Sequence, residues 1–508
     1  MWYLPKALDN ALNRITMYRL VLYYLIGLLA FAFVLAFPRA LNFDPVALLF
    51  SVGFLLAVCG LTNWIFARVF SATTNSESAW ISALILALII TPPQTGSDIW
   101  LLFWAGVLAM ASKYIVAIGR KHLFNPVAFA VSATYLLANQ PASWWVGSAP
   151  MLLPVLLGGV LIARKLRRFD LVLSFLGVSL ATSLALSVFA GDNPFSALVS
   201  VWLYSPLVFF AAVILTEPLT APPTRRLRVV YGALVGFLFT PQVHFGPIYV
   251  TPELALLAGN LYSYLVSPKF ALGLRLKRKI QLAPDVYDFI FARPPRMAFA
   301  PGQYMEWTLG HADTDSRGNR RYFTLASSPT ESELRVGVKF YQHSSSFKKA
   351  MLALDDETEI VANQLAGDFV LPADPTEKLV FLAGGIGVTP FRSMIQYLLD
   401  TGQRRPIVLF YANKTVDDIL YRDVFDQAQR RLGIEVIYTL TDARKLPASW
   451  QGRVGRLSPK LIRAVVPEYR DCTYYISGPN QMVDSFQGVL RDLGIKPARI
   501  KTDYFPGF

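Results

Sequence analysis

Ten apolar runs, separated by short polar breaks, fill the first half of the chain between Leu20 and Val266. Five of them approach the ~20 residues with which a helix crosses the ~30 Å hydrocarbon core of a membrane. The pattern predicts an α-helical membrane domain of about ten spans over residues 20–268. The long runs are residues 20–37, 46–66, 100–119, 171–190 and 195–215, and the short runs are residues 80–90, 127–137, 151–163, 229–239 and 254–266.

Basic side chains in the polar breaks test this count. With the N-terminus inside, the basic clusters fall in the cytoplasmic breaks, whereas the opposite breaks hold only Arg39. Such an asymmetry follows the positive-inside rule and predicts a multi-pass protein of the inner (cytoplasmic) membrane with both termini cytoplasmic. Residues 1–19 are predicted to lie on the lipid surface as an interfacial segment, anchored by Trp2, Tyr3 and Leu4.

Two short motifs occur twice in this half. Residues 91–95 (TPPQT) and 216–220 (TEPLT) share the form T-x-P-x-T at an offset of 125, and His122 and His244 open a looser pair at an offset of 122. In the ten-span topology the members of each pair lie on opposite sides of the membrane. They predict an inverted five-plus-five repeat, an architecture that places binding sites near the midplane. The alternative is that Thr- and Pro-rich breaks recur by chance.

The sequence of the apolar half resembles one protein family. Its motifs are residues 121–126 (KHLFNP), 144–147 (WWVG) and 216–226 (TEPLTAPPTRR), followed by Tyr231 and Gly232. They are similar to the membrane subunit shared by sodium-pumping NADH:quinone oxidoreductases and Rnf-type electron transport complexes. The resemblance implies a ten-span inverted repeat that binds flavin and passes electrons within or across the membrane.

One departure concerns covalent flavin. Members of that family commonly carry FMN esterified to a Thr in an S-G-A-T type motif that contains an Asp, whereas the nearest string here, residues 132–134 (SAT), lacks the Asp. Small polar residues in an apolar run are typical of a helix contact. A non-covalent FMN or another flavin in the membrane domain is therefore the expectation.

The pattern changes near Phe270 to short strands and turns. Residues 280–283 and 286–291 flank a Pro-Asp turn, and a small antiparallel β-barrel over residues 269–374 is the simplest fold for this stretch. Arg321, Phe323 and Thr324 then belong to a string of the form R-x-[aromatic]-[S/T]-x-x-S-x-P. An arginine can neutralise a pyrophosphate, an aromatic ring can pack on an isoalloxazine, and a hydroxyl can bond near flavin N5.

Two further segments complete the predicted barrel site. Residues 338–341 are predicted to form a strand, which includes Val338 and Lys339. Ser345 and Ser346 open a helix that ends near Leu354, where hydroxyls and backbone N–H groups suit a phosphate. Simple N-capping of that helix is the alternative.

A glycine loop marks the start of the last domain, residues 375–508. A buried strand over residues 379–383 leads into Gly384, Gly385 and Gly387, then Thr389 and Pro390, and a helix over residues 391–399. Glycines let the backbone approach a pyrophosphate at a helix N-terminus. Strands over residues 407–411, 435–440 and 473–477 alternate with helices and predict a doubly wound parallel sheet, with Ser477, Gly478, Pro479 and Met482 in a second loop at the same edge.

Over residues 270–508 the motifs occur in the order of the ferredoxin–NADP reductase family, which this half resembles. The resemblance implies FAD and either NADH or NADPH as cofactors. It assigns FAD to Arg321, Tyr322, Phe323, Thr324, Val338, Lys339, Ser345 and Ser346, the nucleotide to Gly384, Gly385, Gly387, Thr389, Pro390, Gly478, Pro479 and Met482, and catalysis to Thr324, Ser477 and Asp503. Ser477 stands where the family often has Cys. The tail over residues 503–508 is expected to fold back on the flavin, and a frayed terminus is the alternative.

The amino-acid composition restricts which redox cofactors and partners the two halves can use. Two cysteines among 508 residues exclude a self-contained iron–sulfur cluster, which needs about four ligands. Four histidines, two of them in the apolar half, argue against a transmembrane haem reductase, and only the net charge of +14 would favour nucleic acid. No metal site is expected.

The predicted function is transfer of electrons from cytoplasmic NAD(P)H through FAD into the membrane domain. A quinone or an extracytoplasmic flavoprotein would accept them, and flavins or a partner subunit with a flavin or iron–sulfur cluster would carry them. A redox-coupled ion transporter and a reductase merely anchored by its helices are the alternatives.

Overall fold

The computed structural model describes residues 8, 11–12, 15–70, 76–118, 121–268, 271–295, 297–312, 314–315, 317–442, 444 and 446–503. The chain forms two compact units, with the boundary at Leu272. The predicted anchors Trp2, Tyr3 and Leu4 lie outside the described residues, as do residues 504–508 of the predicted tail.

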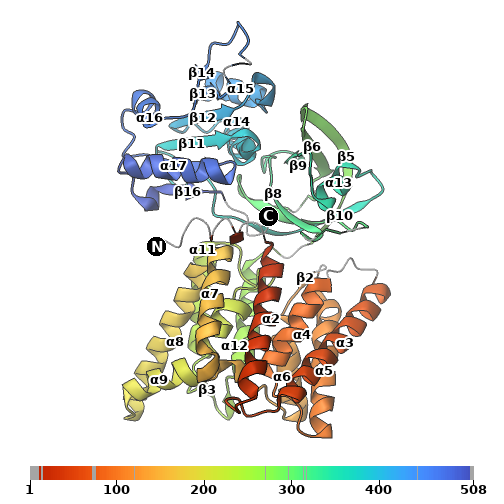
Figure 1. Cartoon of the computed structure of the whole chain (residues 1–508). Coiled ribbons are helices and arrows are strands. Elements are labelled where there is room, and N and C mark those ends of the chain that lie inside the picture. Colours follow the sequence, from red (N-terminus) through yellow and green to blue (C-terminus); the bar gives the residue numbers. More distant parts are fainter. Residues whose placement is uncertain are drawn as a thin grey trace. The chain divides into compact units, whose positions relative to one another are not determined.

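The described residues of the predicted apolar runs are largely helical in the first unit (Figure 1). The run 100–119 enters a short strand at residues 117–118, and the run 195–215 is interrupted at residues 205–206. The short runs owe their length to Pro and turn residues at their ends, such as Asn125 and Pro126, which cap and begin one of them. The helices are α2 (Met17–Ala36), α3 (Pro45–Val69), α4 (Ser76–Ile89), α5 (Gly96–Ile115), α6 (Pro126–Ala138), α7 (Leu152–Leu166), α8 (Phe169–Ala190), α9 (Pro194–Tyr204), α10 (Leu207–Phe209), α11 (Arg225–Leu238) and α12 (Pro252–Val266), with a π-helical segment (Phe210–Ile214) after α10.

Within the described residues, five helices are long and apolar enough to cross a membrane: α2, α3, α5, α8 and α7 with the short turn before it. The bent pair of α9 and α10, whose axes differ by 63°, would be a sixth. The helices α4, α6, α11 and α12 have 14, 13, 14 and 15 residues. At ~1.5 Å per residue, each reaches only about 20 Å. Ten full spans thus remain a prediction.

Two of the short helical segments form the centre of this unit. Each residue from Ala83 to Ile90, and each from Leu207 to Leu215, is buried. A helix that is apolar on all sides is expected in such a position. Both segments end directly before a T-x-P-x-T string, so the motif marks equivalent places in the two halves of the unit.

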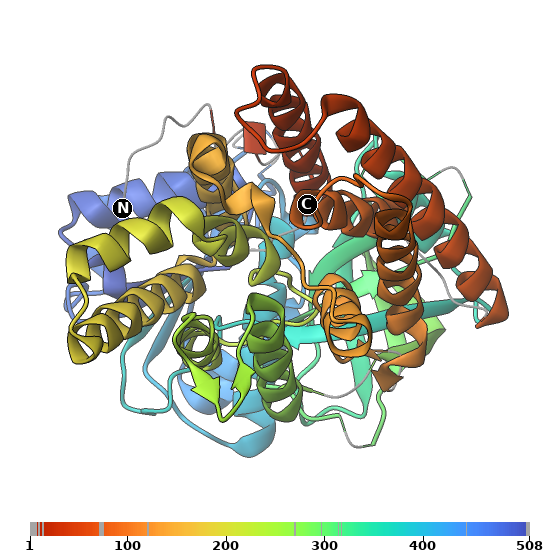
Figure 2. The ribbon, with the colours of Figure 1, turned by 90° about the horizontal axis from the view of Figure 1, so that it is seen from below.

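The structure corrects the second motif pair of the predicted repeat. Hairpin β1–β2 (Ala117–Ile118 and Lys121–His122) precedes α6, and hairpin β3–β4 (His244–Phe245 and Ile248–Tyr249) precedes α12. His122 ends its hairpin whereas His244 begins the other, so the two histidines are not equivalent. Figure 1 shows β2 and β3 at opposite ends of the helical unit, as an inverted repeat requires, and β3–β4 lies at the near end in Figure 2.

Close helix packing joins α8 and α11. A Cβ atom at Gly232 would lie 2.8 Å from the Leu171 carbonyl oxygen, and one at Gly236 would lie 2.5 Å from that of Phe175. Glycines four residues apart form a small-xxx-small face, which lets the backbones of two membrane helices approach.

The second unit begins with the predicted barrel. Its six strands are ordered β8-β7-β10-β5-β6-β9. Phe340 and Tyr341, predicted to be in a strand, follow the end of β9, because the chain turns there toward helix α13 (Ser346–Leu352). The strands are β5 (Leu272–Ala283), β6 (Val286–Ala292), β7 (Tyr304–Thr308), β8 (Arg320–Thr324), β9 (Glu333–Lys339) and β10 (Glu359–Ala366).

A parallel sheet of order β14-β13-β12-β11-β15-β16 completes the unit, as the alternation of strands and helices predicts. Apolar side chains from both of its faces form two buried clusters with the covering helices. The strands are β11 (Leu379–Gly384), β12 (Ile407–Asn413), β13 (Glu435–Leu440), β14 (Arg453–Val454), β15 (Thr473–Ser477) and β16 (Ile500–Thr502), and the longer helices are α14 (Thr389–Thr401), α15 (Arg422–Leu432) and α17 (Asn480–Asp492).

Candidate active site

The barrel side of the site is built on β8 and α13. Alternation along β8 puts Arg321 and Phe323 on one face of the strand. Phe347 of α13 contacts both: the Arg321 guanidinium carbon lies 5.2 Å from the centre of its ring, and the Phe323 ring centre lies 6.1 Å away. The flavin motif and the start of α13, 22 residues further along the chain, therefore meet. Thr324, at the end of β8, is buried opposite Tyr304.

Tyr322 points the other way. Its hydroxyl donates to the buried Glu306 carboxylate at 2.7 Å and to Gln364 at 3.2 Å. Because successive side chains of a strand face opposite sides of the sheet, Tyr322 is not brought together with Arg321 and Phe323. Its assignment to the cofactor is not supported by this placement.

Positive charge gathers at this face. Arg321 is 5% exposed, and its Nη2 atom has no hydrogen-bond acceptor among the described residues, although the Asp315 carboxylate lies 3.9 Å away. Burial lowers the pKa of Arg321 to about 10. Burial, and then the charge of Arg321, lower the pKa of Lys348 to about 8. A buried arginine with an unsatisfied donor and a partly buried lysine beside it fit the pyrophosphate of FAD.

The predicted phosphate serines have protein partners. Ser345 caps α13, since its hydroxyl accepts a hydrogen bond from the Lys348 N–H at 3.3 Å. This contact corresponds to the alternative of simple N-capping. The Ser346 N–H donates to the Asp315 carboxylate at 2.9 Å, and the Ser346 hydroxyl lies 3.0 Å from His311 Nε2. A carboxylate thus binds the N–H group that was predicted to take a phosphate oxygen.

Val338 and Lys339 end β9 beside this site. Val338 is buried, and the Lys339 ammonium pairs with Asp285 at 3.2 Å. The Lys339 carbonyl accepts a hydrogen bond from the Lys348 ammonium at 2.7 Å. Lys339 therefore orients a cation of the site through its backbone rather than its charge.

The nucleotide side consists of two loops at one edge of the parallel sheet. Ala383 of β11 pairs with Ser477 of β15, so Gly384 and Gly478 follow at adjacent strand ends. A Cβ atom at Gly387 would lie 2.5 Å from the Gly478 Cα atom. The loops hence touch backbone to backbone, in the position where open α/β sheets bind dinucleotides.

Other predicted residues of this side surround that contact. A Cβ atom at Gly384 would lie 2.2 Å from Met482 Sδ and 3.4 Å from the Pro479 ring, and Gly385 has φ of +52°. Thr389 and Pro390 begin α14, and the Thr389 hydroxyl donates to the Ile386 carbonyl at 3.2 Å. The structure brings five of the nucleotide-assigned residues together, Gly384, Gly387, Gly478, Pro479 and Met482, and Gly385, Thr389 and Pro390 follow in the first loop and the start of α14.

Ser477 and Asp503, both predicted to be catalytic, are also neighbours. The Ser477 hydroxyl donates to the Asp503 carboxylate at 3.1 Å, and Ser477 is buried. The Asp503 N–H bonds to the Ile476 carbonyl, which extends the pairing of β15 with β16.

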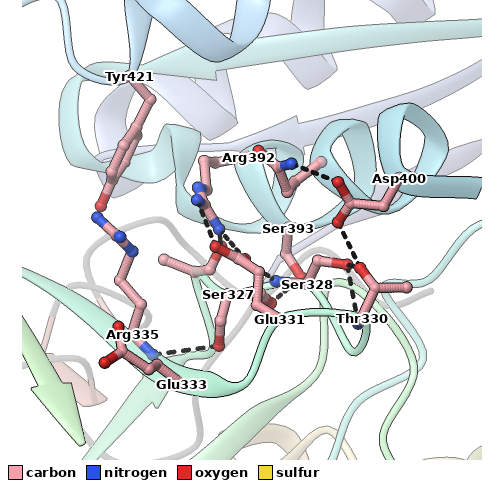
Figure 3. A network of polar contacts seen from close by, with 12 residues as sticks. Ser327, Ser328, Thr330, Glu331, Glu333, Arg335, Arg392, Ser393, Asp400 and Tyr421 are labelled. Carbon is pink, nitrogen blue, oxygen red and sulfur yellow. Dashed lines mark hydrogen bonds and ion pairs between the residues drawn. The ribbon is translucent and has the colours of Figure 1, made fainter.

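Sequence reasoning missed a set of contacts that joins the barrel to the nucleotide domain. We name it the domain latch, and it consists of Asp288, Glu331, Arg335, Arg392 and Tyr421. Figure 3 shows Arg392 reaching from α14 to Glu331. Glu331 and Arg392 are ordinary surface residues by sequence, and only their pairing across 61 positions distinguishes them.

Comparison with known proteins identifies part of this unit. Residues 381–488 match the family model described as the oxidoreductase NAD-binding domain. The chain carries an oxidoreductase NAD-binding domain. The glycine loop and the Ser477 loop both lie within that match.

Several curated proteins share this half of the chain. The glycine betaine monooxygenase reductase subunit of Pseudomonas aeruginosa is 21% identical over 49% of this chain and 69% of its own length. NADH-cytochrome b5 reductase 1 of Ajellomyces capsulatus is 27% identical, over 47% of this chain and 79% of its own length. The flavohemoprotein of Pseudomonas putida is 28% identical, over 46% of this chain and only 58% of its own length.

Solved structures match the same share of the chain. The Amycolatopsis cytochrome P450 reductase GcoB has a TM-score of 0.41 at 20% identity, over 46% of this chain and 69% of that one. The curated relatives are oxidoreductases, so the predicted class, an NAD(P)H-dependent flavoprotein oxidoreductase, is confirmed. The resemblance of the apolar half to a membrane subunit family stays a prediction.

Proposed function

We propose that this chain is a membrane-bound oxidoreductase that passes electrons from cytoplasmic NAD(P)H through FAD into its helical unit and on to a quinone or an extracytoplasmic flavoprotein. The observation that carries the proposal is the backbone contact of Gly387 with Gly478, beside the pair of Ser477 and Asp503. This nucleotide site belongs to the same chain as five helices of membrane-spanning length.

Bound FAD would supply the redox chemistry, which is acceptance of a hydride from C4 of the reduced nicotinamide, with NAD(P)⁺ as the product, and release of the two electrons one at a time. The chain supplies binding and orientation. Arg321 and Lys348 would neutralise the pyrophosphate, the half-exposed Phe323 ring would support the isoalloxazine, and the Ser477 hydroxyl, oriented by Asp503, would bind beside the nicotinamide.

Transfer across the membrane needs a second carrier, because a single hop over ~30 Å of hydrocarbon is too long. A flavin between the halves of the repeat is the proposed carrier. Ser132 and Thr134 are buried inside α6, and the Thr134 hydroxyl donates to the Val131 carbonyl at 3.1 Å. Such a threonine is unsuited to esterification, which favours a non-covalent flavin.

Reconstitution in liposomes tests the proposal. External NAD(P)H should reduce a dye that is enclosed in vesicles containing the full-length protein. Reduction of external acceptors alone would contradict transmembrane transfer and favour an anchored reductase. Flavin analysis of the purified chain should find two flavins, both released by acid, and a single FAD would count against the relay.

A second candidate follows from the relatives. The glycine betaine monooxygenase reductase subunit and the stachydrine N-demethylase reductase subunit Stc4 of Rhizobium meliloti are named as reductase subunits. By analogy, this chain would reduce a separate partner, such as an oxygenase component at the membrane. In that case an added partner protein, rather than a quinone or an enclosed dye, would receive the electrons.

A further inference from the structure

The domain latch joins the two nucleotide-binding parts of the reductase through buried polar groups. The Tyr421 hydroxyl, from the nucleotide domain, donates to Asp288 of β6 at 2.5 Å. Arg335 of β9 donates to the other oxygen of the same carboxylate at 2.7 Å. Asp288 is fully buried, so a hydrogen bond to it forms in a medium of low dielectric, where its loss is costly.

A second arm of the domain latch lies on α14. Arg392 forms a two-pronged ion pair with Glu331, one arm of which, from Nη2, measures 2.8 Å. Its Nη1 atom also donates to the Ala326 carbonyl at 3.0 Å, and the next residue, Ser393, donates to the Ser327 carbonyl at 2.6 Å. Figure 3 shows these groups converging from α14 and from the chain after β8.

The contacts of the domain latch lie close in sequence to both cofactor motifs. Ala326 and Ser327 follow Thr324 of the flavin motif by two and three residues. Arg392 follows Thr389 of the glycine loop by three residues, which is less than one helical turn. The contacts of Arg392 and Ser393 thus join the segment directly after the flavin motif to the first turn of the helix that follows the glycine loop.

Side chains of the nucleotide domain also approach the backbone of β9 at this place. A Cβ atom at Gly337 of β9 would lie 2.9 Å from the Thr389 methyl group and 2.8 Å from the Tyr421 hydroxyl. Tyr421 itself has φ of +53°, an uncommon conformation for an aromatic residue. Such a conformation persists where the surroundings determine it, and strained residues cluster at functional sites.

We propose that Arg392 and Tyr421 are positioning residues that hold the start of α14 at a set distance from the flavin motif, and so set the geometry of hydride transfer. Neither residue touches the reacting atoms. The inference rests on the proposed hydride transfer from NAD(P)H to FAD. Since an error of ~1 Å in placement can cost about a hundredfold in rate, a hydrogen bond remote from the chemistry can matter.

The test compares Tyr421→Phe with Tyr438→Phe in the full-length protein. Tyr438 is the matched control, because its hydroxyl donates to Asp426 at 2.9 Å within the nucleotide domain alone. In anaerobic stopped flow, Tyr421→Phe should lower the rate constant of flavin reduction at saturating NAD(P)H by about tenfold or more, with FAD content and the Kd for NAD(P)H within about twofold of wild type. Arg392→Lys should lower the same rate constant to a similar extent. In this variant the long-wavelength charge-transfer band that forms on mixing with NAD(P)H should also weaken.

A second measurement needs no cofactor. Amide hydrogen exchange of residues 325–333 and 389–395 should be faster in Tyr421→Phe than in wild type, and unchanged in Tyr438→Phe. Wild-type rates and exchange in both Tyr421→Phe and Arg392→Lys would overturn the inference. If wild type itself shows no flavin reduction by NAD(P)H, the proposed function fails instead, and the exchange result still decides whether the domain latch holds the two parts together.

Discussion

The Ser477 hydroxyl donates a hydrogen bond to the Asp503 carboxylate across 3.1 Å, and this bond joins the Ser477 loop to the residue that directly follows β16. Ser477→Ala should lower the rate constant of flavin reduction by about tenfold, the scale of one lost hydrogen bond to a charged group. The Kd for NAD(P)H should change little, because the backbone of the loop stays in place. Ser477→Cys is the control and should keep or raise the rate, and an unaltered rate in Ser477→Ala would contradict the role.

Three glycines of the nucleotide site are predicted to respond differently to alanine. Gly387→Ala should raise the Kd for NAD(P)H by at least about tenfold, because its Cβ atom meets the backbone of Gly478 at 2.5 Å, which has no rotamer to change. Gly385→Ala meets no atom within 4 Å and should cost only the ~1 kcal/mol of its positive φ.

Gly384→Ala is the diagnostic case, because its Cβ atom meets a flexible side chain, Met482 Sδ. The double variant Gly384→Ala/Met482→Ala should therefore restore much of the nucleotide affinity that Gly384→Ala loses. Titration of the full-length protein with NAD(P)⁺ measures all these values. Equal losses in the single and double variants would show that the loop geometry is wrong.

The Asp315 carboxylate accepts a hydrogen bond from the Ser346 N–H group, which is predicted to bind a phosphate. Asp315→Asn should strengthen FAD binding by about fivefold, since removing ~1 kcal/mol of charge repulsion corresponds to that change in Kd. Fluorescence titration of the flavin-depleted chain checks this. Asp356→Asn, at an exposed acid, should leave the Kd unaltered, and weaker FAD binding in Asp315→Asn would mean that the carboxylate supports the site instead.

FAD affinity should fall as pH rises above about 8. Burial, and then Arg321, lower the pKa of Lys348 to about 8, so the free lysine is charged below that pH and loses its proton above it. Only the charged form of Lys348 attracts the pyrophosphate of FAD, so FAD binding is strongest below pH 8. The affinity then falls with rising pH until the higher pKa that Lys348 has in the FAD-bound protein is reached. Lys348→Gln should flatten this dependence, whereas Lys349→Gln, at an exposed neighbour, should retain it.

In the helical unit, Gly236→Ala should destabilise the packing of α8 on α11. Its Cβ atom would lie 2.5 Å from the Phe175 carbonyl oxygen, and such overpacking costs about 1–3 kcal/mol. Gly177→Ala on α8 is the control, because nothing lies within 4 Å of its Cβ position. Unfolding in mixed micelles should separate the two variants, and equal stability would argue against the close packing.

Local patterns in the sequence determined most of the elements. The apolar runs are largely helical because their residues favour that state and the breaks between them contain Pro and turn formers. The strand before Gly384 and the helix after Thr389 are similarly local, and the motifs that carry the NAD-binding domain could be found for this reason. Alternation along β8 could also have placed Tyr322 on the face opposite Phe323.

Contacts between distant segments could not be predicted in this way. The Asp288–Tyr421 bond spans 133 positions and the Arg392–Glu331 pair 61, and each depends on how the sheets and α14 pack together. The same holds for Asp315, which reaches the predicted phosphate site only through the fold of its loop. Likewise, only the positions of the hairpins β1–β2 and β3–β4 showed that His122 and His244 do not occupy equivalent places in the repeat.

The sequence by itself therefore determined the two kinds of unit, the order of their elements and the chemistry of the loops, because these follow from periodicity and from residue type over short windows. Only the tertiary structure decided which side chains meet across the barrel and the sheet. The physical reason is that burial and hydrogen bonding between remote elements depend on their three-dimensional placement, which no local pattern encodes.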